Sequence, residues 1–282
     1  MDWLSLSFLT DTKIPVGAWC RDLFDALNAA IGPAIDLFAD SLRDSVDWIV
    51  DTVLIPPPIV VVLLFVALAY ALQRRWQTAL LVLVGFLFIL NQGYWEETIQ
   101  SLTLVLLACT ACMLIGVPIG IAGAHHPRFY RALVPVLDLM QTLPTFVYLI
   151  PTVVLFGIGI VPGLIATVIF VLPAPIRLTY LGISSTPTAL IEAAQAFGAT
   201  KRQLLWKVEL PSATPQIMAG LNQAIMLSLS MVVIAGLVGA AGLGVPVVRA
   251  LNTVNTALGF ESGFIIVIVA IMLDRTLRVR KP

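Results

Sequence analysis

The chain repeats long apolar runs that carry almost no charge, and this feature constrains its fold more than any other. A helix needs about 20 apolar residues to cross the hydrocarbon core of a bilayer, and several runs approach or exceed that length. In chain order the runs are 56–72, 78–92, 98–123, 144–160, 163–183, 215–238 and 260–277. Because polar and apolar residues do not alternate along them, they predict helices rather than barrel strands.

The composition also indicates a membrane protein. Of the 282 residues, 59% are hydrophobic and 11% are charged, whereas a soluble domain carries roughly 25% charged residues. Most of the surface therefore faces something other than water. The sequence predicts an all-α polytopic membrane protein, with about seven transmembrane helices over residues 55–282.

Basic residues gather in alternate connections between the runs, which predicts the orientation of the chain. They are Arg74 and Arg75 after the first run, Arg128 and Arg131 after the third, Lys201, Arg202 and Lys207 after the fifth, and Arg275, Arg278, Arg280 and Lys281 after the seventh. The opposite connections hold Glu96, Glu97, Glu261 and Arg249. Because cytoplasmic loops are enriched in Lys and Arg, we expect the N-terminus outside the membrane and the C-terminus in the cytoplasm.

Residues 1–54 form a separate acidic segment ahead of the first run. They hold nine Asp against three basic residues, and they lack the features of a cleavable signal peptide. Apolar residues recur every three or four positions with Asp on the other side, which predicts an amphipathic helix interrupted at Gly32-Pro33. We expect this extracytoplasmic helix to lie on the outer membrane face or against the bundle, in a structural role rather than in substrate binding.

The most informative polar segment, residues 185–213, lies between the fifth and sixth runs. Its pattern is Glu192-Ala193-Ala194, then Gly198, and after nine intervening residues Val208-Glu209-Leu210-Pro211. Pro187 is expected to start a short helix whose small residues fit a groove in a partner, and Glu192 offers that partner a carboxylate. Gly198 suits the end of that helix, and Leu210-Pro211 predicts a break before the next run. The alternative is an ordinary charged loop.

This pattern resembles the cytoplasmic coupling loop in the membrane subunit of ATP-binding-cassette importers, with Val208 where that family has isoleucine. Other segments are similar to permeases for glycine betaine, proline betaine and choline, namely residues 137–151, 155–159, 162–163 and 222–244. The resemblance runs from about residue 55 to residue 275. It implies the five-helix core of type I importer permeases in the cytoplasmic (inner) membrane of a bacterium.

The resemblance also implies partners and roles. Two ATP-binding-cassette ATPase subunits would bind ATP and Mg, an extracytoplasmic binding protein would deliver the substrate, and a second copy of this chain would complete the pathway. The residues implied to couple the pathway to the ATPase are Glu192, Ala193, Ala194, Gly198, Leu210 and Pro211. The implied substrates are choline, glycine betaine and proline betaine, with carnitine and ectoine as alternatives. Nucleic acid is not an expected partner.

The sequence contains no G-x-x-x-x-G-K-[ST] loop, the pattern that cradles nucleotide phosphates. We therefore expect a transport subunit that is not an enzyme and has no cofactor of its own. An ion-coupled secondary transporter is the alternative, but it would need ionisable groups within the membrane and usually internal repeats. Neither is evident beyond Asp138 and Arg177. A membrane-embedded enzyme would need a polar constellation at the span ends, which the sequence does not suggest.

Candidate pathway residues are mostly aromatic or soft apolar side chains, which suit a quaternary amine through cation–π contact. They are Met140, Tyr148, Phe156, Asn222, Met226 and Met231. Any single methionine is more readily explained by helix packing. Asp138 and Arg177 are expected at similar depth near the inner face, where they approach each other and shape the inner mouth. The alternative is that each extends separately to the membrane interface.

Two candidate metal or redox patterns have simpler explanations. Cys109 and Cys112 form a C-x-x-C pattern, but their apolar setting opposes the thiolate that redox or metal chemistry needs. His125 and His126 have no carboxylate or thiol neighbours in the sequence, so they make a poor set of metal ligands. No metal site is predicted.

Glycine marks two further features. The small residues Gly116 and Gly120 are spaced for close helix packing. Gly239, Gly242 and Gly244 follow the sixth run and predict a turn or partial re-entry near the outer face.

Overall fold

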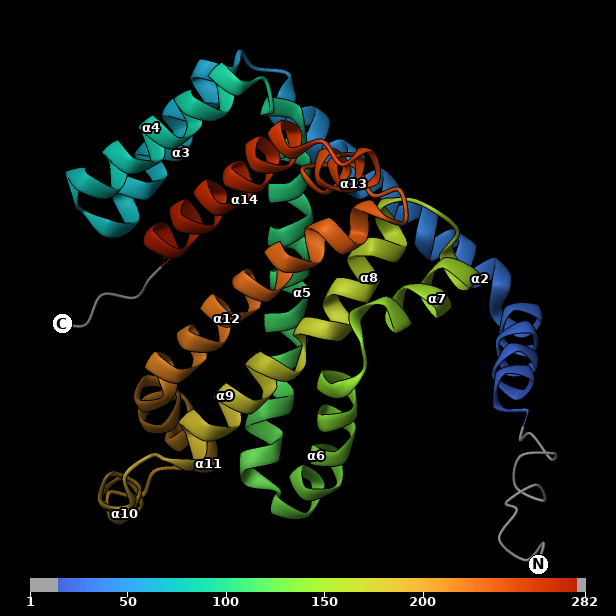
Figure 1. The fold of residues 1–282 in the computed structure, drawn as a ribbon. Coiled ribbons are helices and arrows are strands. Elements are labelled where there is room, and N and C mark those ends of the chain that lie inside the picture. Colours follow the sequence, from blue (N-terminus) through green and yellow to red (C-terminus); the bar gives the residue numbers. More distant parts are fainter. Residues whose placement is uncertain (1–14, 278–282) are drawn as a thin grey trace, which may run out of the picture.

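Helices account for every regular element of residues 15–277, the part of the chain that the computed structural model describes (Figure 1). In chain order they are α2 (Val16–Leu54), α3 (Pro58–Gln73), α4 (Trp76–Gln92), α5 (Trp95–His125), α6 (Pro127–Thr142), α7 (Thr145–Phe156), α8 (Ile160–Val171), α9 (Pro173–Ser184), α10 (Thr188–Ala196), α11 (Lys201–Leu204), the π-helix η1 (Leu205–Glu209), α12 (Leu210–Gly236), α13 (Gly244–Thr253) and α14 (Thr256–Leu277). The predicted all-α class is confirmed. Lys13, Arg278, Arg280 and Lys281 lie outside the described residues.

Fewer helices are long enough to cross a membrane than the sequence predicts. Four stretches of the described chain are long and apolar enough, and they are Trp95–His125, Ile160–Ser184, Lys201–Gly236 and Thr256–Leu277. The number rises to six if each of two bent pairs, α2 with α3 and α6 with α7, makes one span. The apolar runs predict about seven spans. The number is lower in the structure because α3 and α7 each form one arm of a bent pair, and because α4, with 17 residues, is shorter than the four long helices.

Pro144 causes the bend between α6 and α7. Leu143 has an extended backbone, with φ −65° and ψ 134°, because a following proline disfavours the helical conformation. The two helices are bent by 96° at this point. The run 144–160 therefore forms a helix of 12 residues that ends at Phe156, rather than a full span.

The amphipathic helix of the N-terminal segment is α2, and it packs against α5, α7 and α8. The predicted interruption at Gly32-Pro33 is wrong, because α2 continues through both residues, although its ribbon changes direction along its length (Figure 1). A proline removes one hydrogen bond and bends a helix without ending it. Val46, which is 1% exposed, joins the main core, so α2 is part of the bundle.

The centre of the fold is α9, which packs against both α5 and α12 (Figure 1). A Cβ added to Gly120 would lie 2.6 Å from the Cβ of Thr179 and 2.7 Å from the carbonyl oxygen of Ile176. One added to Gly116 would lie 3.0 Å from Pro175. Membrane helices associate through such close packing, because lipid provides little hydrophobic driving force between them. These two glycines therefore allow the α5–α9 contact.

The glycine-rich segment after α12 forms the predicted turn. Gly239 and Gly242 have φ values of +83° and +126°, which other residues rarely adopt. The Leu243 N–H donates to Ser101 Oγ at 2.8 Å, and a Cβ on Gly244 would lie 2.1 Å from the carbonyl oxygen of Val232. The turn is therefore a tightly packed link that holds the start of α13 against α5 and α12.

Replacing Gly120 with valine is expected to destabilise the protein by about 1–3 kcal/mol through overpacking. The added side chain meets the α9 backbone carbonyl of Ile176, which cannot move without moving the helix. Thermal unfolding of the purified protein measures the effect. Gly263→Val is the matched control, because nothing lies within 4 Å of a Cβ at Gly263. Equal unfolding temperatures for the two variants would contradict the packing argument.

Candidate coupling segment and pathway residues

The short helix α10 projects from one end of the bundle, at the lower left of Figure 1. Pro187 stands directly before it, and none of its nine residues is buried. Glu192 and Ala193 are exposed and Ala194 is half-buried. Glu192 takes part in none of the ion pairs found within residues 15–277. Its carboxylate is therefore available to another molecule.

Gly198 terminates α10 with a defined hydrogen-bond pattern. Its N–H donates to the carbonyl oxygen of Gln195 at 2.9 Å, and the N–H of Ala199 donates to that of Ala194 at 3.0 Å. This pair of bonds is a Schellman motif, which needs a left-handed residue after the helix. Gly198 supplies it with φ +78°. The direction in which the chain leaves α10 is thus fixed by the backbone.

Large apolar side chains surround this projecting helix. Phe197 is 93% exposed, Trp206 is 64% exposed and Leu190 is 50% exposed. A cluster of exposed apolar side chains marks a protein–protein contact surface, and aromatic residues often carry most of the binding energy in such contacts. The segment has both the shape and the chemistry of a docking element.

The predicted break at Leu210-Pro211 is wrong. The chain is helical from Lys201 to Gly236, and the five-residue π-helix η1 precedes Leu210. The Leu210 N–H donates to the carbonyl oxygen of Leu205, five residues back. Pro211 has no N–H to donate, and the wider π turn accommodates it without interrupting the helix. Movement of α11 is therefore transmitted directly to α12.

Sequence reasoning missed a contact between His125 and Glu209. His125 has no carboxylate neighbour in the sequence, but the fold places its Nε2 2.9 Å from Glu209 Oε2. Glu209 is 5% exposed and lies in η1, while His125 ends α5. A buried carboxylate needs a partner, so this contact ties α5 to the base of the polar segment. The sequence feature that could have revealed this contact is Glu209 itself, because it is a charged residue between two apolar residues of a helix.

Asp138 and Arg177 are in direct contact. Arg177 Nη2 donates to Asp138 Oδ1 at 2.6 Å, joining α6 to α9. The Arg177 and Asp138 side chains are 34% and 56% exposed. Beside them the rings of Tyr130 and Tyr180 stack, with centroids 3.4 Å apart and planes 3° apart. Sequence reasoning did not predict this stack.

The candidate pathway residues fall into two groups. Met226 is 42% exposed, and Met140, Phe156 and Asn222 are half-buried. Phe156 packs edge-on against Phe38 of α2, with ring centroids 6.4 Å apart.

The other two candidates, Tyr148 and Met231, are buried in one small core cluster, where the Tyr148 hydroxyl donates to the carbonyl oxygen of Met140. In this conformation Tyr148 and Met231 pack the core, while Met226 is open to contact.

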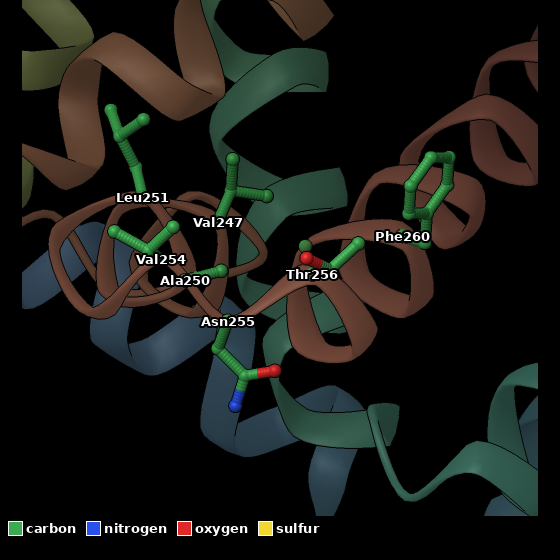
Figure 2. A pocket seen from close by; sticks show the side chains of 8 residues that line it. Val247, Ala250, Leu251, Val254, Asn255, Thr256 and Phe260 are labelled. Atoms are coloured by element: carbon green, nitrogen blue, oxygen red, sulfur yellow. The ribbon is translucent and has the colours of Figure 1, made fainter.

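A surface groove of about 440 Å³ lies between α13 and α14, and Figure 2 shows its lining. Leu251, Val254 and Phe260 supply most of its exposed apolar surface. Asn255 and Thr256 are polar members of the lining, but it includes no charged side chain. The groove therefore lacks the charged groups expected of a site for a small charged substrate.

Cys109 and Cys112 are buried and unpaired. Cys109 Sγ lies 3.6 Å from Ser228 Oγ, and Cys112 donates to the carbonyl oxygen of Val168 at 3.5 Å. Both thiols serve packing between helices. Within residues 15–277, no group of three or more His, Cys, Asp or Glu side chains could hold a metal ion.

Comparison with known proteins places this fold in a family. Residues 116–274, more than half of the chain, match the binding-protein-dependent transport system inner membrane component. The chain belongs to this family. It is a multi-pass permease of the inner membrane, and hence a transport subunit rather than an enzyme.

Relatives of this permease are named for betaine transport. It is 46% identical to the glycine betaine transport system permease protein OpuAB of Bacillus subtilis, over 93% of each chain. It is 44% identical to the glycine betaine/carnitine transport permease protein GbuB of Listeria monocytogenes, over 93% of this chain and 94% of that protein. It is 42% identical to the glycine betaine/proline betaine permease protein ProW of Escherichia coli, over 94% and 74%. These identities confirm the resemblance to glycine betaine permeases that the sequence motifs indicated.

The fold of the permease also has solved counterparts. An inward-facing conformation of the MetNI methionine ABC transporter aligns with a TM-score of 0.58, over 64% of this chain and 94% of that chain, at 23% identity. This similarity confirms the predicted fold of an importer permease. At that identity it says nothing about substrate.

Removal of the His125 side chain is expected to destabilise the permease by about 1–3 kcal/mol, because the buried Glu209 carboxylate loses its partner. Thermal unfolding of His125→Ala measures this loss. Limited trypsin digestion checks its location, since Lys201, Arg202 and Lys207 lie in the segment that the contact anchors.

His126→Ala is the control for this experiment. The exposed His126 ring bonds to the carbonyl oxygen of Ala122, four residues back, and to no other helix among residues 15–277, so its loss should change neither measurement. The argument fails if His125→Ala and His126→Ala unfold and digest alike.

Proposed function

We propose that this permease forms the translocation pathway of an ATP-driven importer for betaine-type quaternary ammonium compounds, with glycine betaine as the main substrate. The observation that carries this proposal is the high identity to glycine betaine permeases over nearly the whole chain. Proline betaine and choline are further candidates of the same chemistry. Carnitine is a fourth, because GbuB is named for it.

The exposed helix α10 supports coupling to a separate ATPase. Glu192, Ala193, Ala194 and Gly198 would form the docking element, together with the exposed aromatic ring of Phe197. Leu210 and Pro211 continue from η1 into α12, so we assign them to transmission rather than to contact. ATP and Mg would bind only to the ATPase.

Charge distribution supports an orientation with α10 in the cytoplasm. Lys201, Arg202 and Lys207 follow α10, and positive charge favours the cytoplasmic side. The first turn of α5 is acidic instead, with Glu96 and Glu97. There, burial raises the pKa of Tyr94, and the carboxylates of Glu261 and Glu97 raise it further. On this orientation the N-terminal segment 1–54 is extracytoplasmic.

The complete importer would contain two copies of this permease, two ATPase subunits and an extracytoplasmic binding protein. One permease chain with one coupling helix suits a twofold-symmetric homodimer, with the pathway at the interface. Closure of the ATPases on ATP would draw the two α10 helices together and open the pathway outward. The ATPases must bind the two permease conformations with different free energies, or no transport is driven.

Uptake of radiolabelled glycine betaine into cells that express the permease, the ATPase and the binding protein tests this proposal. ATPase-dependent uptake is expected. Uptake that persists without the ATPase would instead indicate the secondary-transporter alternative. ATPase-dependent uptake of choline but not of glycine betaine would leave the importer standing and overturn the substrate.

Phe197→Ala is expected to weaken binding of the ATPase by about 2 kcal/mol or more, roughly thirtyfold, as for an interface aromatic anchor. Binding of purified ATPase to the permease in nanodiscs measures this loss. Phe260→Ala is the matched control, because Phe260 is also exposed, at 76%, but belongs to the first turns of α14, whose start beside α13 is far from α10 (Figure 1). Unchanged ATPase binding by Phe197→Ala would exclude this docking surface.

Glu192→Lys is expected to abolish ATPase binding and uptake while leaving membrane insertion intact. Glu192 is exposed and takes part in none of the ion pairs of residues 15–277, so the variant should purify like the wild type. Reversal of its charge would repel a basic partner. Normal uptake by this variant would refute the role of Glu192 in coupling.

A further inference from the structure

The ion pair between Asp138 and Arg177 is unusually open for charges in a membrane bundle. The two side chains join α6 to α9 at 2.6 Å, yet they are 56% and 34% exposed. The helices that carry them, α6 and α9, extend into the same half of the bundle as α10 (Figure 1). Charged groups within a membrane face water-filled cavities or each other rather than lipid. The exposed side of this pair therefore faces an aqueous space.

The pair has hydrogen-bonding capacity that it does not use. Arg177 donates through Nη2, but its Nε is buried and has no hydrogen-bond partner among the described residues. Asp138 accepts through Oδ1, and no hydrogen bond to its Oδ2 is found in residues 15–277. A guanidinium can hold a carboxylate through two parallel N–H bonds. The pair leaves both groups partly unsatisfied, so it can exchange its mutual bond for a second anion at Arg177 and a second cation at Asp138.

Aromatic rings flank the same two charges. Tyr130 of α6 stacks on Tyr180 of α9, and Tyr180 follows Arg177 by three positions, on the same face of α9. The outer face of an aromatic ring attracts a quaternary ammonium group, which cannot donate a hydrogen bond. The two helices thus bring an anion, a cation and aromatic faces to one place.

The geometry points to a binding site for zwitterionic quaternary amines at this ion pair, where the substrate is held briefly before release. Its ammonium would lie against Asp138 and the tyrosine rings, and its carboxylate would bind Arg177. A cationic amine without a carboxylate, such as choline, would gain only half of these contacts and would be repelled by Arg177. This inference rests on the proposed function, which it deepens by selecting betaines over choline.

The site would also change the contact between α6 and α9. A zwitterion that pairs with Asp138 and Arg177 competes with their bond to each other, so substrate loosens the link between the two helices. Departure of the substrate restores the link. Binding of substrate at this site therefore affects α9. Because α9 leads directly into the segment that carries α10, that segment responds to whether the pathway is occupied.

Saturation-transfer NMR on the permease–ATPase complex in nanodiscs, without binding protein, tests this site. The N-methyl protons of glycine betaine and of choline are compared at equal concentration. A stronger signal is expected for glycine betaine. Arg177→Gln is expected to weaken glycine betaine binding about tenfold, which corresponds to loss of one charge-assisted contact, and to leave choline binding unchanged or stronger. Asp138→Asn should weaken binding of both amines.

Two further variants complete the experiment. Arg177→Lys keeps the positive charge, so it can still pair with Asp138 if Arg177→Gln fails to fold, but it cannot hold a carboxylate in bidentate fashion. It should lose part of the preference for glycine betaine. Arg249→Gln is the matched control, because Arg249 is an exposed arginine on α13, and it should leave both signals unchanged.

Equal signals for the two amines in the wild type would overturn the inference. So would a glycine betaine signal that survives in every variant of Arg177 and Asp138. Because ATPase-dependent uptake is measured separately, either result can be obtained while the importer function holds. A failure of uptake would count against the proposed function instead.

Discussion

The rest of the structure depends on the close approach of three helix backbones around α9. On one side, Gly116 and Gly120 allow α5 to approach α9 closely. On the other side, a Cβ on Gly182 would lie 2.9 Å from the Cβ of Ala213 in α12. In lipid such contacts replace the hydrophobic driving force that packs soluble helices. Because a packed interface of this kind is rigid, displacement of α9 must move α5 and α12 with it. Both ends of α9 carry function: one holds the ion pair with α6, and the other leads into α10.

The polar segment that follows α9 is anchored firmly to the bundle, as the proposed coupling role requires. Its end is held twice, once by the unbroken helix that joins α11, η1 and α12, and once by the contact of Glu209 with His125. A loop held only at α9 would swing without moving the bundle. With both anchors, a pull on α10 acts on α5, α9 and α12 together. The buried carboxylate fits this role, because losing its partner is costly and the contact therefore resists rupture.

Much of this architecture is readable from local sequence. The apolar runs predicted the helices, Pro187 and Gly198 predicted the bounds of α10, and the glycine pattern after α12 predicted the turn. Errors arose where long-range context overrides a local rule. Proline was read as a break at Pro33 and at Pro211, yet both helices continue, and before Pro211 a π turn accommodates the missing N–H. The contact of His125 with Glu209 joins residues 84 positions apart, and no local pattern reveals such a pair.

A release site in a transporter needs to bind weakly, and a preformed ion pair provides weak binding. Asp138 and Arg177 already satisfy part of each other's charge, so a zwitterion gains only the difference between its own contacts and the contact that it displaces. Partial exposure to water lowers that difference further, since solvent screens both pairs. Tight binding would trap the substrate at the inner mouth and stop the cycle. Selectivity at such a site is therefore paired with low affinity, and high-affinity capture is left to a binding protein on the outer side.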